Sequence, residues 1–539
     1  MYFIYYYLIS LSILGYGYFF SSKLRFNTNN LGIVGLNGIF VLILISYLTT
    51  FFFTHSKIFN STVLLFGLSL LFFYTKKKNN FNFFLHFLVF FILFIFILSG
   101  KNHDDFPYYH FPYTHILTQF NHPVGLGLIN NGFRNPSSLF YLNSLFYLPK
   151  IEFYLYHLGS VFFLGYANLF FIKNIFSKDF FKKNKFFNLI NLIFFIFTNI
   201  IFYRLSEYGT DKAGQILVII IFIILIFVLN NKSKNNDNYM LFKSLIVLGC
   251  ITISLKPFYL IYSSFLIYFI LNDQIRYFLG KFIKSKFLFI VLFYLCFSFL
   301  ITFLNSGCLI FPASFTCFEN FSWSVPQKEV VDVKIWYELW SKAGATPNYV
   351  VDNRLEYISN FNWFLNWIDN YFFNKFSDYI LSLLLISLIF FLVFKFKNKK
   401  IIKVKNRENR IIYLFLFFFT IEWFLYHPTL RYGGYHLFAL ITFIPLIFYV
   451  ERIDFDWNFF FKRSIILIFI TVLIFVSRNI VRLQKEYKVY DYNFVKDTKY
   501  KFINNDLDFY LRYNKIIENK DFNYEYKNII GKNILIIKK

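Results

Sequence analysis

The stretch from Ala213 to Leu229, AGQILVIIIFIILIFVL, is almost entirely apolar and contains no charged residue. Its length falls within the range of about 17–25 residues that cross a hydrocarbon core as a helix. Strands of a membrane barrel would instead alternate apolar and polar residues over about ten positions, whereas this stretch is apolar on every face. It therefore predicts a membrane-spanning α-helix.

Similar blocks recur along the whole chain, and helices are the form that pairs every backbone group within lipid. The fold class that we predict is an all-α polytopic membrane protein with about 14 transmembrane helices. The expected spans are 2–20, 31–53, 58–74, 82–99, 156–172, 186–203, 213–229, 241–255, 257–271, 287–304, 378–394, 411–425, 435–450 and 464–477.

The composition supports a membrane protein. Of the 539 residues, 57% are hydrophobic and only 16% are charged, and the mean hydropathy is +0.51. A soluble protein carries about a quarter of its residues as charged side chains. The composition therefore excludes a soluble enzyme or binding module, and we expect the lipid bilayer to be the main partner of the chain.

The net charge of +26 is unevenly distributed. Seven short connections between spans hold 28 Lys and Arg residues, whereas the alternate connections, although much longer, hold 13. This is the pattern of the positive-inside rule. We therefore expect a bacterial inner (cytoplasmic) membrane protein whose amino terminus, long loops and carboxyl tail face the periplasm. The basic charge sets topology, and no nucleic-acid partner is expected.

The expected spans and loops divide the chain into six parts. These are four N-terminal spans (1–99), an outer loop (100–155), six central spans (156–304), a second outer loop (305–377), four C-terminal spans (378–477) and an outer tail (478–539). Interfacial helices are expected in both long loops, because the second contains tryptophans spaced for them. The tail predicts a small α or α/β appendage. Cys308 and Cys317 either form a disulfide on the oxidising side or remain unpaired thiols.

The first outer loop contains an acidic pair, Asp104 and Asp105, with His103 and His110 close by. One of the carboxylates would act as a general base for an acceptor hydroxyl, or both would hold a divalent cation such as Mg²⁺ or Mn²⁺. The alternative is that one aspartate caps a short interfacial helix. His103 and His110 are candidates for binding the substrate on which the aspartates would act.

Cationic residues in other outer connections are candidates for phosphate binding. Arg431, followed by Tyr432 and two glycines, would present a bidentate donor to a phosphate, although interfacial arginines also anchor spans. Arg134 and Lys256 are further candidates. Glu207, Asp211 and Lys212, with Arg204 nearby, are better explained by capping and mutual pairing. Glu422 is an ionisable residue within a span, where pairing with Arg431 would also account for it.

The layout resembles that of the GT-C superfamily of integral-membrane glycosyltransferases. The resemblance depends on Asp104-Asp105 as an acidic motif in an early outer loop, and on Arg431-Tyr432 as a late arginine on the phosphate side. It implies a polyprenyl-phosphate sugar donor, a cell-surface glycan or lipid acceptor, and an aspartate that acts as base or metal ligand. One departure is that the acidic loop follows the fourth span rather than the first.

Two other functions remain open from the sequence. The first is a surface-polysaccharide polymerase or ligase of the O-antigen type, in which Arg431, Arg354 and Arg134 would matter more than the aspartates. The second is a non-enzymatic lipid or glycan exporter. An exporter is expected to have charged residues or helices interrupted by Gly or Pro at mid-membrane depth. Few such features are found beyond Glu422 and the turn at Pro257.

Overall fold

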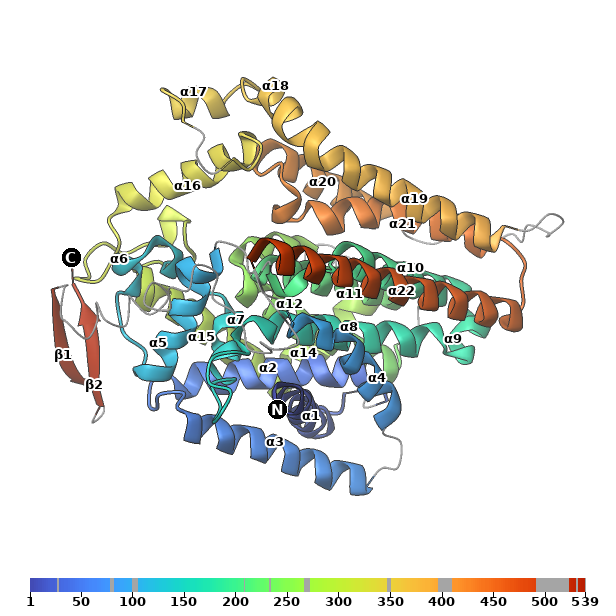
Figure 1. Cartoon of the computed structure of the whole chain (residues 1–539), viewed down its shortest axis with the longest axis horizontal. Coiled ribbons are helices and arrows are strands. Elements are labelled where there is room, and N and C mark those ends of the chain that lie inside the picture. The colour runs from blue at the N-terminus through green and yellow to red at the C-terminus, as the bar shows by residue number, and fades with distance from the viewer. Residues whose placement is uncertain are drawn as a thin grey trace.

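A computed structural model describes residues 1–26, 29–77, 82–98, 105–207, 209–231, 234–265, 272–346, 350–395, 410–490, 523–529 and 532–538. Within these residues, ten helices are long and apolar enough to cross a membrane, and three further apolar helices are shorter. The chain is therefore a multi-pass, helical membrane protein, as its composition predicts (Figure 1).

The helices and strands follow one another along the chain in a simple order. The larger α-helices, which include two of the three shorter apolar ones (α10 and α20), are α1 (Tyr2–Lys23), α2 (Leu31–Thr49), α3 (Lys57–Lys77), α8 (Gly159–Ile175), α10 (Lys185–Ile201), α11 (Thr210–Asn230), α12 (Asn236–Leu255), α15 (Lys286–Ser306), α19 (Ser377–Phe394), α20 (Arg410–Tyr426), α21 (Gly434–Glu451) and α22 (Trp457–Tyr490). The shorter α-helices are α4 (Phe83–Leu93), α5 (Phe111–Gln119), α6 (Leu126–Ile129), α7 (Ser138–Ser144), α9 (Lys178–Lys183), α14 (Asp273–Ile283), α16 (Gln327–Lys342), α17 (Arg354–Ile358) and α18 (Phe364–Trp367).

Other short elements connect these helices. They are the 3-10 helices η1 (Phe94–Phe96), η3 (Asn131–Phe133), η4 (Tyr156–Leu158), η5 (Leu205–Glu207), η6 (Pro257–Ser264), η7 (Ser314–Thr316) and η9 (Leu430–Tyr432), the π-helices η2 (Phe106–His110) and η8 (Ile368–Phe376), and the strands β1 (Tyr524–Ile529) and β2 (Lys532–Ile537).

Thirteen of the fourteen predicted spans contain an α-helix, although in the fourth, 82–99, helix α4 ends at Leu93 and the 3-10 helix η1 follows. The ninth, 257–271, begins instead with the 3-10 helix η6, and residues 266–271 lie outside the described part. Pro257 at the start of η6 removes a backbone donor, which is compatible with a first helical turn but not with the continuation of α12. The number of fourteen spans therefore stays a prediction.

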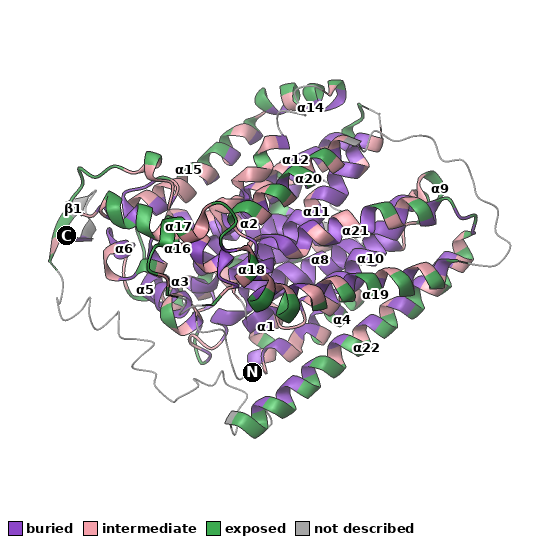
Figure 2. Ribbon diagram, turned by 90° about the horizontal axis from the view of Figure 1, so that it is seen from above, coloured by how far each residue is buried: buried purple, intermediate pink, exposed green. Residues whose placement is uncertain are grey.

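The helices differ in how much of their surface is covered by protein. In α11, 83% of the apolar window is buried, and α8 beside it is buried to a similar degree, whereas the figure for α3 is 17%. A helix that is apolar all round is suited to the centre of a bundle or to lipid contact. Figure 2 shows α8, α10 and α11 in the centre, with α19 and α22 presenting exposed residues along their length.

Close helix packing at the amino terminus depends on glycine. A Cβ atom at Gly17 would lie 1.9 Å from the carbonyl oxygen of Val34, and one at Gly38 would lie 1.9 Å from that of Ile13. Small residues allow helix backbones to approach closely in membranes, where packing rather than hydrophobic burial favours association. These positions therefore hold α1 against α2.

The two sets of connections predicted from charge gather at opposite ends of the bundle. At one end Lys185 lies 3.6 Å from Asp454, which joins two of the basic connections. At the other end the amide of His55 donates to the carbonyl of Leu117 at 3.0 Å, which joins two of the long, charge-poor ones. Each of these contacts joins two connections of the same set, and the alternation along the whole chain and the outward orientation of the second end stay predictions.

The two long loops fold into short helices at that second end, and the tail joins them. Cys308 and Cys317 form the disulfide that their spacing allowed. Strands β1 and β2 form an antiparallel hairpin, and Val124 of the first long loop extends it by exchanging two 2.9 Å backbone hydrogen bonds with Leu535 and Ile537. The described part of the predicted tail thus contains the last turns of α22 and this β-hairpin, and the α or α/β appendage stays a prediction because 491–522 lie outside the described residues. Helix α22 continues to Tyr490, beyond the predicted end of the last span at 477.

Candidate functional site

The segment that carries Arg431 is fixed by hydrogen bonds to its backbone. The indole Nε1 atoms of Trp367 and Trp423 donate to the carbonyls of Pro428 and Thr429, each at 2.7 Å. The amide nitrogen of Gln215 donates to the carbonyl of Arg431 at 3.1 Å. Contacts from three helices therefore hold the turn in one place, and this preorganises the side chain that projects from it.

The turn ends with a change of backbone direction. Gly433 adopts a φ of +101°, a conformation that residues with a Cβ rarely adopt, and α21 begins at the next residue. The glycine pair that suggested an accessible arginine in the sequence therefore has a backbone role.

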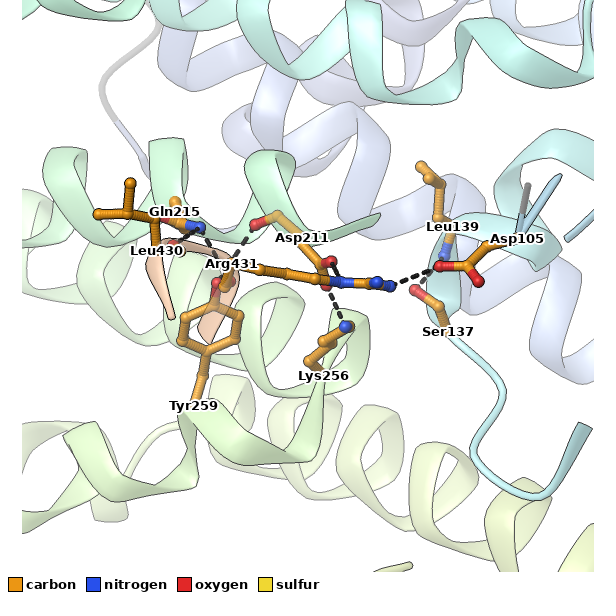
Figure 3. A network of polar contacts seen from close by, with 9 residues as sticks. All are labelled: Asp105, Ser137, Leu139, Asp211, Gln215, Lys256, Tyr259, Leu430 and Arg431. Carbon is orange, nitrogen blue, oxygen red and sulfur yellow. Dashed lines mark hydrogen bonds and ion pairs between the residues drawn. The ribbon is translucent and has the colours of Figure 1, made fainter. Parts of the chain in front are cut away.

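The Arg431 guanidinium joins two carboxylates from distant parts of the chain. Its Nη2 atom donates to Oδ2 of Asp105 at 2.7 Å, and its Nε atom donates to Oδ2 of Asp211. The other oxygen of Asp211 pairs with Nζ of Lys256. Figure 3 shows the four side chains together, with Asp211 between Lys256 and Arg431 and with Asp105 at the far end of the Arg431 guanidinium. We call these four residues the charged network.

Asp105 directs its carboxylate into the network rather than onto its own helix. It precedes η2, and its side chain makes no capping hydrogen bond there. The capping alternative is therefore wrong for this residue. Its side chain is 26% exposed, compared with 8% for Asp211. Asp105 is the more accessible acid of the network.

Asp211 is the network residue that the sequence interpretation missed. It lies in the first turn of α11, where the expected role was helix capping or pairing with a nearby cation, Lys212 or Arg204. Its carboxylate instead holds Arg431 and Lys256 together. The available signal was an acid directly before the most apolar span, and the partner 220 residues further along could not be deduced from spacing.

The two cations of the network respond differently to their surroundings. Burial lowers the pKa of Lys256, and the attraction of Asp211 opposes this only in part. Burial also disfavours the charge on Arg431, but Asp211 and Asp105 outweigh it and raise the pKa of the guanidinium. Arg431 is therefore a permanent charge, whereas the charge of Lys256 depends on pH.

Aromatic side chains form one wall beside the network. The ring of Trp340, in α16, has its centre 5.8 Å from the Cζ atom of Arg431, which is the distance of a cation–π contact. Tyr432 packs edge-on against Trp340, and the Nζ atom of Lys256 lies 5.7 Å from the Tyr432 ring. Trp340 thus brings the second long loop against Arg431, whereas the ring beside Lys256 comes from the turn that carries Arg431.

The structure places His110 beside the network and Arg134 in a buried contact of its own, and their roles in substrate binding stay predictions. Burial lowers the pKa of His110 to about 3, so the ring beside the network is neutral at physiological pH. Arg134 is itself buried and donates to Glu329 at 2.5 Å and to the carbonyl of Gly127 at 3.0 Å. It thereby ties the first long loop to α16, and its guanidinium is occupied by that contact.

Two of the predicted site residues, His103 and Asp104, lie outside the described residues. Among those that are described, no group of three or more His, Cys, Asp or Glu side chains has the arrangement of a metal site. The Asp105 carboxylate is engaged with Arg431, so the described residues do not fit a metal. A Mg²⁺ or Mn²⁺ site on Asp104 and Asp105 stays a prediction.

The fold and the site define a multi-pass membrane protein with a charged network at one end of its helical bundle. Residues 1–438 match the model of the family described as Domain of unknown function (DUF8201), and the chain belongs to this family. The matched region includes all four residues of the charged network. Neither the curated proteins nor the solved structures contain a match to the chain.

Proposed function

We propose that this protein is a membrane glycosyltransferase that moves a sugar from a polyprenyl-phosphate donor to a cell-surface glycan or lipid acceptor at the outer face of the membrane. The observation that supports the proposal most directly is the Arg431 guanidinium, held between the accessible Asp105 and the buried Asp211 with Lys256 beside it. A phosphate-binding pair of cations and a carboxylate thus lie within one side-chain length of each other.

The cations supply the donor site in this proposal. A guanidinium binds phosphate through parallel N–H donors, and an ammonium adds a point charge. Asp211 orients both cations from its buried position and is a positioning residue. Asp105 has the place that a phosphate oxygen of the donor would take on Nη2 of Arg431. Because Asp105 is the more exposed of the two acids, it is the partner that a phosphate would displace.

The displaced carboxylate becomes the base of the reaction. Asp105 accepts the proton of the acceptor hydroxyl, whose oxygen attacks the anomeric carbon of the sugar. The bond from that carbon to the phosphate oxygen breaks, and the lipid phosphate leaves with the electron pair. Arg431 and Lys256 stabilise the negative charge that develops on the leaving phosphate. Attack opposite the leaving group inverts the configuration of the sugar.

The outer location has two supports of its own. The network residues all come from the charge-poor connections, which the positive-inside rule assigns to the non-cytoplasmic side. The Cys308–Cys317 disulfide lies in one of the same connections, and disulfides persist in oxidising compartments.

The proposal is tested by mass analysis of surface glycans and lipid-linked sugars from cells with and without the gene, followed by complementation. Loss of a sugar from the glycan, with accumulation of its polyprenyl-phosphate form, is expected without the gene. Asp105→Asn should not restore the glycan, whereas Asp352→Asn, an exposed acid of the second long loop, should restore it. Full restoration by Asp105→Asn would exclude the carboxylate as base.

A further inference from the structure

A second charged cluster lies where η5 meets the carboxyl end of α22, close in sequence to the network but separate from it. It consists of arginines from both elements around one buried glutamate, with a second glutamate and a lysine nearby: Arg204, Glu207, Lys212, Arg478, Arg482 and Glu486. We propose that this cluster is a binding site for a phosphate group, distinct from the charged network. The proposal does not depend on the transferase function.

Arg482 is the residue that points to a ligand. Its side chain is only 6% exposed and donates from Nη1 to Oε1 of Glu207 at 2.6 Å. The Nε and Nη2 atoms are buried and have no hydrogen-bond partner, and the nearest oxygen of Glu486 lies 4.0 Å from Nε. A guanidinium has five N–H donors, and buried donors without partners are costly. Arg482 therefore has the capacity to bind a further acceptor.

The balance of charge favours an anion as that acceptor. Glu207 is shared, because Arg204 donates from Nε to its other oxygen at 2.7 Å. Among the described residues, the cluster contains three arginines against two carboxylates, and Lys212 lies within electrostatic range of Glu207 and Arg204. A water molecule would satisfy hydrogen bonds but not the excess charge. An anion with several oxygens would satisfy both.

The position of the cluster suits a phosphate at the membrane surface. Helix α22 has 34 residues and rises about 51 Å, which exceeds a hydrocarbon core of about 30 Å, so its last turns extend past the core. Arg478, one turn before Arg482, is exposed and lies over the ring of Tyr203 with its Cζ atom 3.7 Å from the centroid. An anion that reaches the buried Arg482 from the surface would therefore pass the exposed Arg478. The phosphate is either that of a lipid headgroup or free phosphate.

The test uses the full chain in detergent and four single variants. Binding of phosphatidic acid is measured by native mass spectrometry, and protection by inorganic phosphate is measured by thermal unfolding. Arg482→Lys keeps the charge but removes donors, Arg478→Gln removes the exposed cation, and Glu207→Gln removes the competing carboxylate. Lys485→Gln is the matched control, because Lys485 is exposed on the same end of α22.

Arg482→Lys should weaken phosphatidic acid binding about tenfold, the value of one charge-assisted hydrogen bond. Glu207→Gln should strengthen it by about threefold, because a like charge is removed from the site. Arg478→Gln should weaken it, and Lys485→Gln should leave it unchanged. If inorganic phosphate protects the variants against thermal unfolding in the same order as their affinities for phosphatidic acid, free phosphate is a ligand of the site. If inorganic phosphate gives no protection, the site is assigned to lipid headgroups.

Because Arg482→Lys should weaken binding and Glu207→Gln should strengthen it, the two variants distinguish a binding site from a cluster with a structural role. A cluster that only stabilises the fold would lose stability in both the Arg482 and Glu207 variants without a change in affinity. Equal affinities for the wild type, Arg482→Lys and Glu207→Gln would overturn the proposal. Should Arg482→Lys not fold, Glu207→Gln and Arg478→Gln decide the matter, and unchanged binding in both overturns it as well.

Discussion

Replacing Asp211 by asparagine should destabilise the protein more than is usual for a residue at the edge of a bundle. The carboxylate is 8% exposed and pairs with both Arg431 and Lys256, so the change leaves two partly buried cations without their shared counter-charge. Breaking a buried ion pair costs about 3–5 kcal/mol, but Arg431 retains Asp105 and the side chains of Lys256 and Arg431 are 24% and 30% exposed, so we expect about 2–3 kcal/mol.

Asp378 provides the matched control for this change. It is also an acid in the first turn of a long apolar helix, α19, but its side chain is exposed. The π-helix η8 runs directly into α19, so Asp378→Asn removes only an exposed charge, and we expect a loss of at most about 0.5 kcal/mol. The protein is titrated with SDS in bicelles, unfolding is monitored by tryptophan fluorescence, and the free energy of unfolding is obtained from the titration curve. Equal losses for Asp211→Asn and Asp378→Asn would refute the argument that Asp211 holds the two cations.

Three further predictions concern the surroundings of Arg431 and the second long loop. Burial lowers the pKa of Lys256, so phosphate binding measured by calorimetry should weaken as the pH rises through that lowered value, and Lys256→Arg should abolish this decline. Trp340→Ala should weaken phosphate binding by about threefold to tenfold through loss of its cation–π contact with Arg431, whereas Trp340→Phe should retain part of it. Replacing Cys308 and Cys317 by serine should lower stability by about 2–3 kcal/mol, and reductant should produce the same loss only in the wild type.

Much of the architecture could be predicted because the bilayer imposes it. A span must be long, apolar and helical, and the bias of basic residues then fixes which connections share a side. The exception was 257–271, where Pro257 starts a 3-10 helix in a segment that hydropathy alone assigns to a span. Hydropathy measures the preference of a segment for lipid and not its backbone conformation.

The site was predictable only in part, because local patterns were interpreted locally. Asp105 and Arg431 stood out as rare charges in an apolar chain, and the structure brings them together. Asp211 was assigned to capping, since the sequence shows its near neighbours but not Arg431. Arg134 attracted interest for the same reason as Arg431, and yet the buried contact with Glu329 occupies it. The roles of these residues depend on which side chains they pair with in the folded chain, and the spacing of residues in the sequence does not show this.

The contact between Asp105 and Arg431 is the central claim, and cross-linking tests it most directly. Asp105→Cys and Arg431→Cys, combined in a chain without its native cysteines, are treated with a short, impermeant bifunctional methanethiosulfonate on intact cells. The linker is needed because the span of an arginine side chain exceeds the reach of a direct disulfide. We predict an efficient cross-link for this pair and none for Asp105→Cys with Asp454→Cys at the opposite end of the bundle. Absence of the cross-link, or its formation only after the cells are opened, would contradict a network that assembles on the outer face.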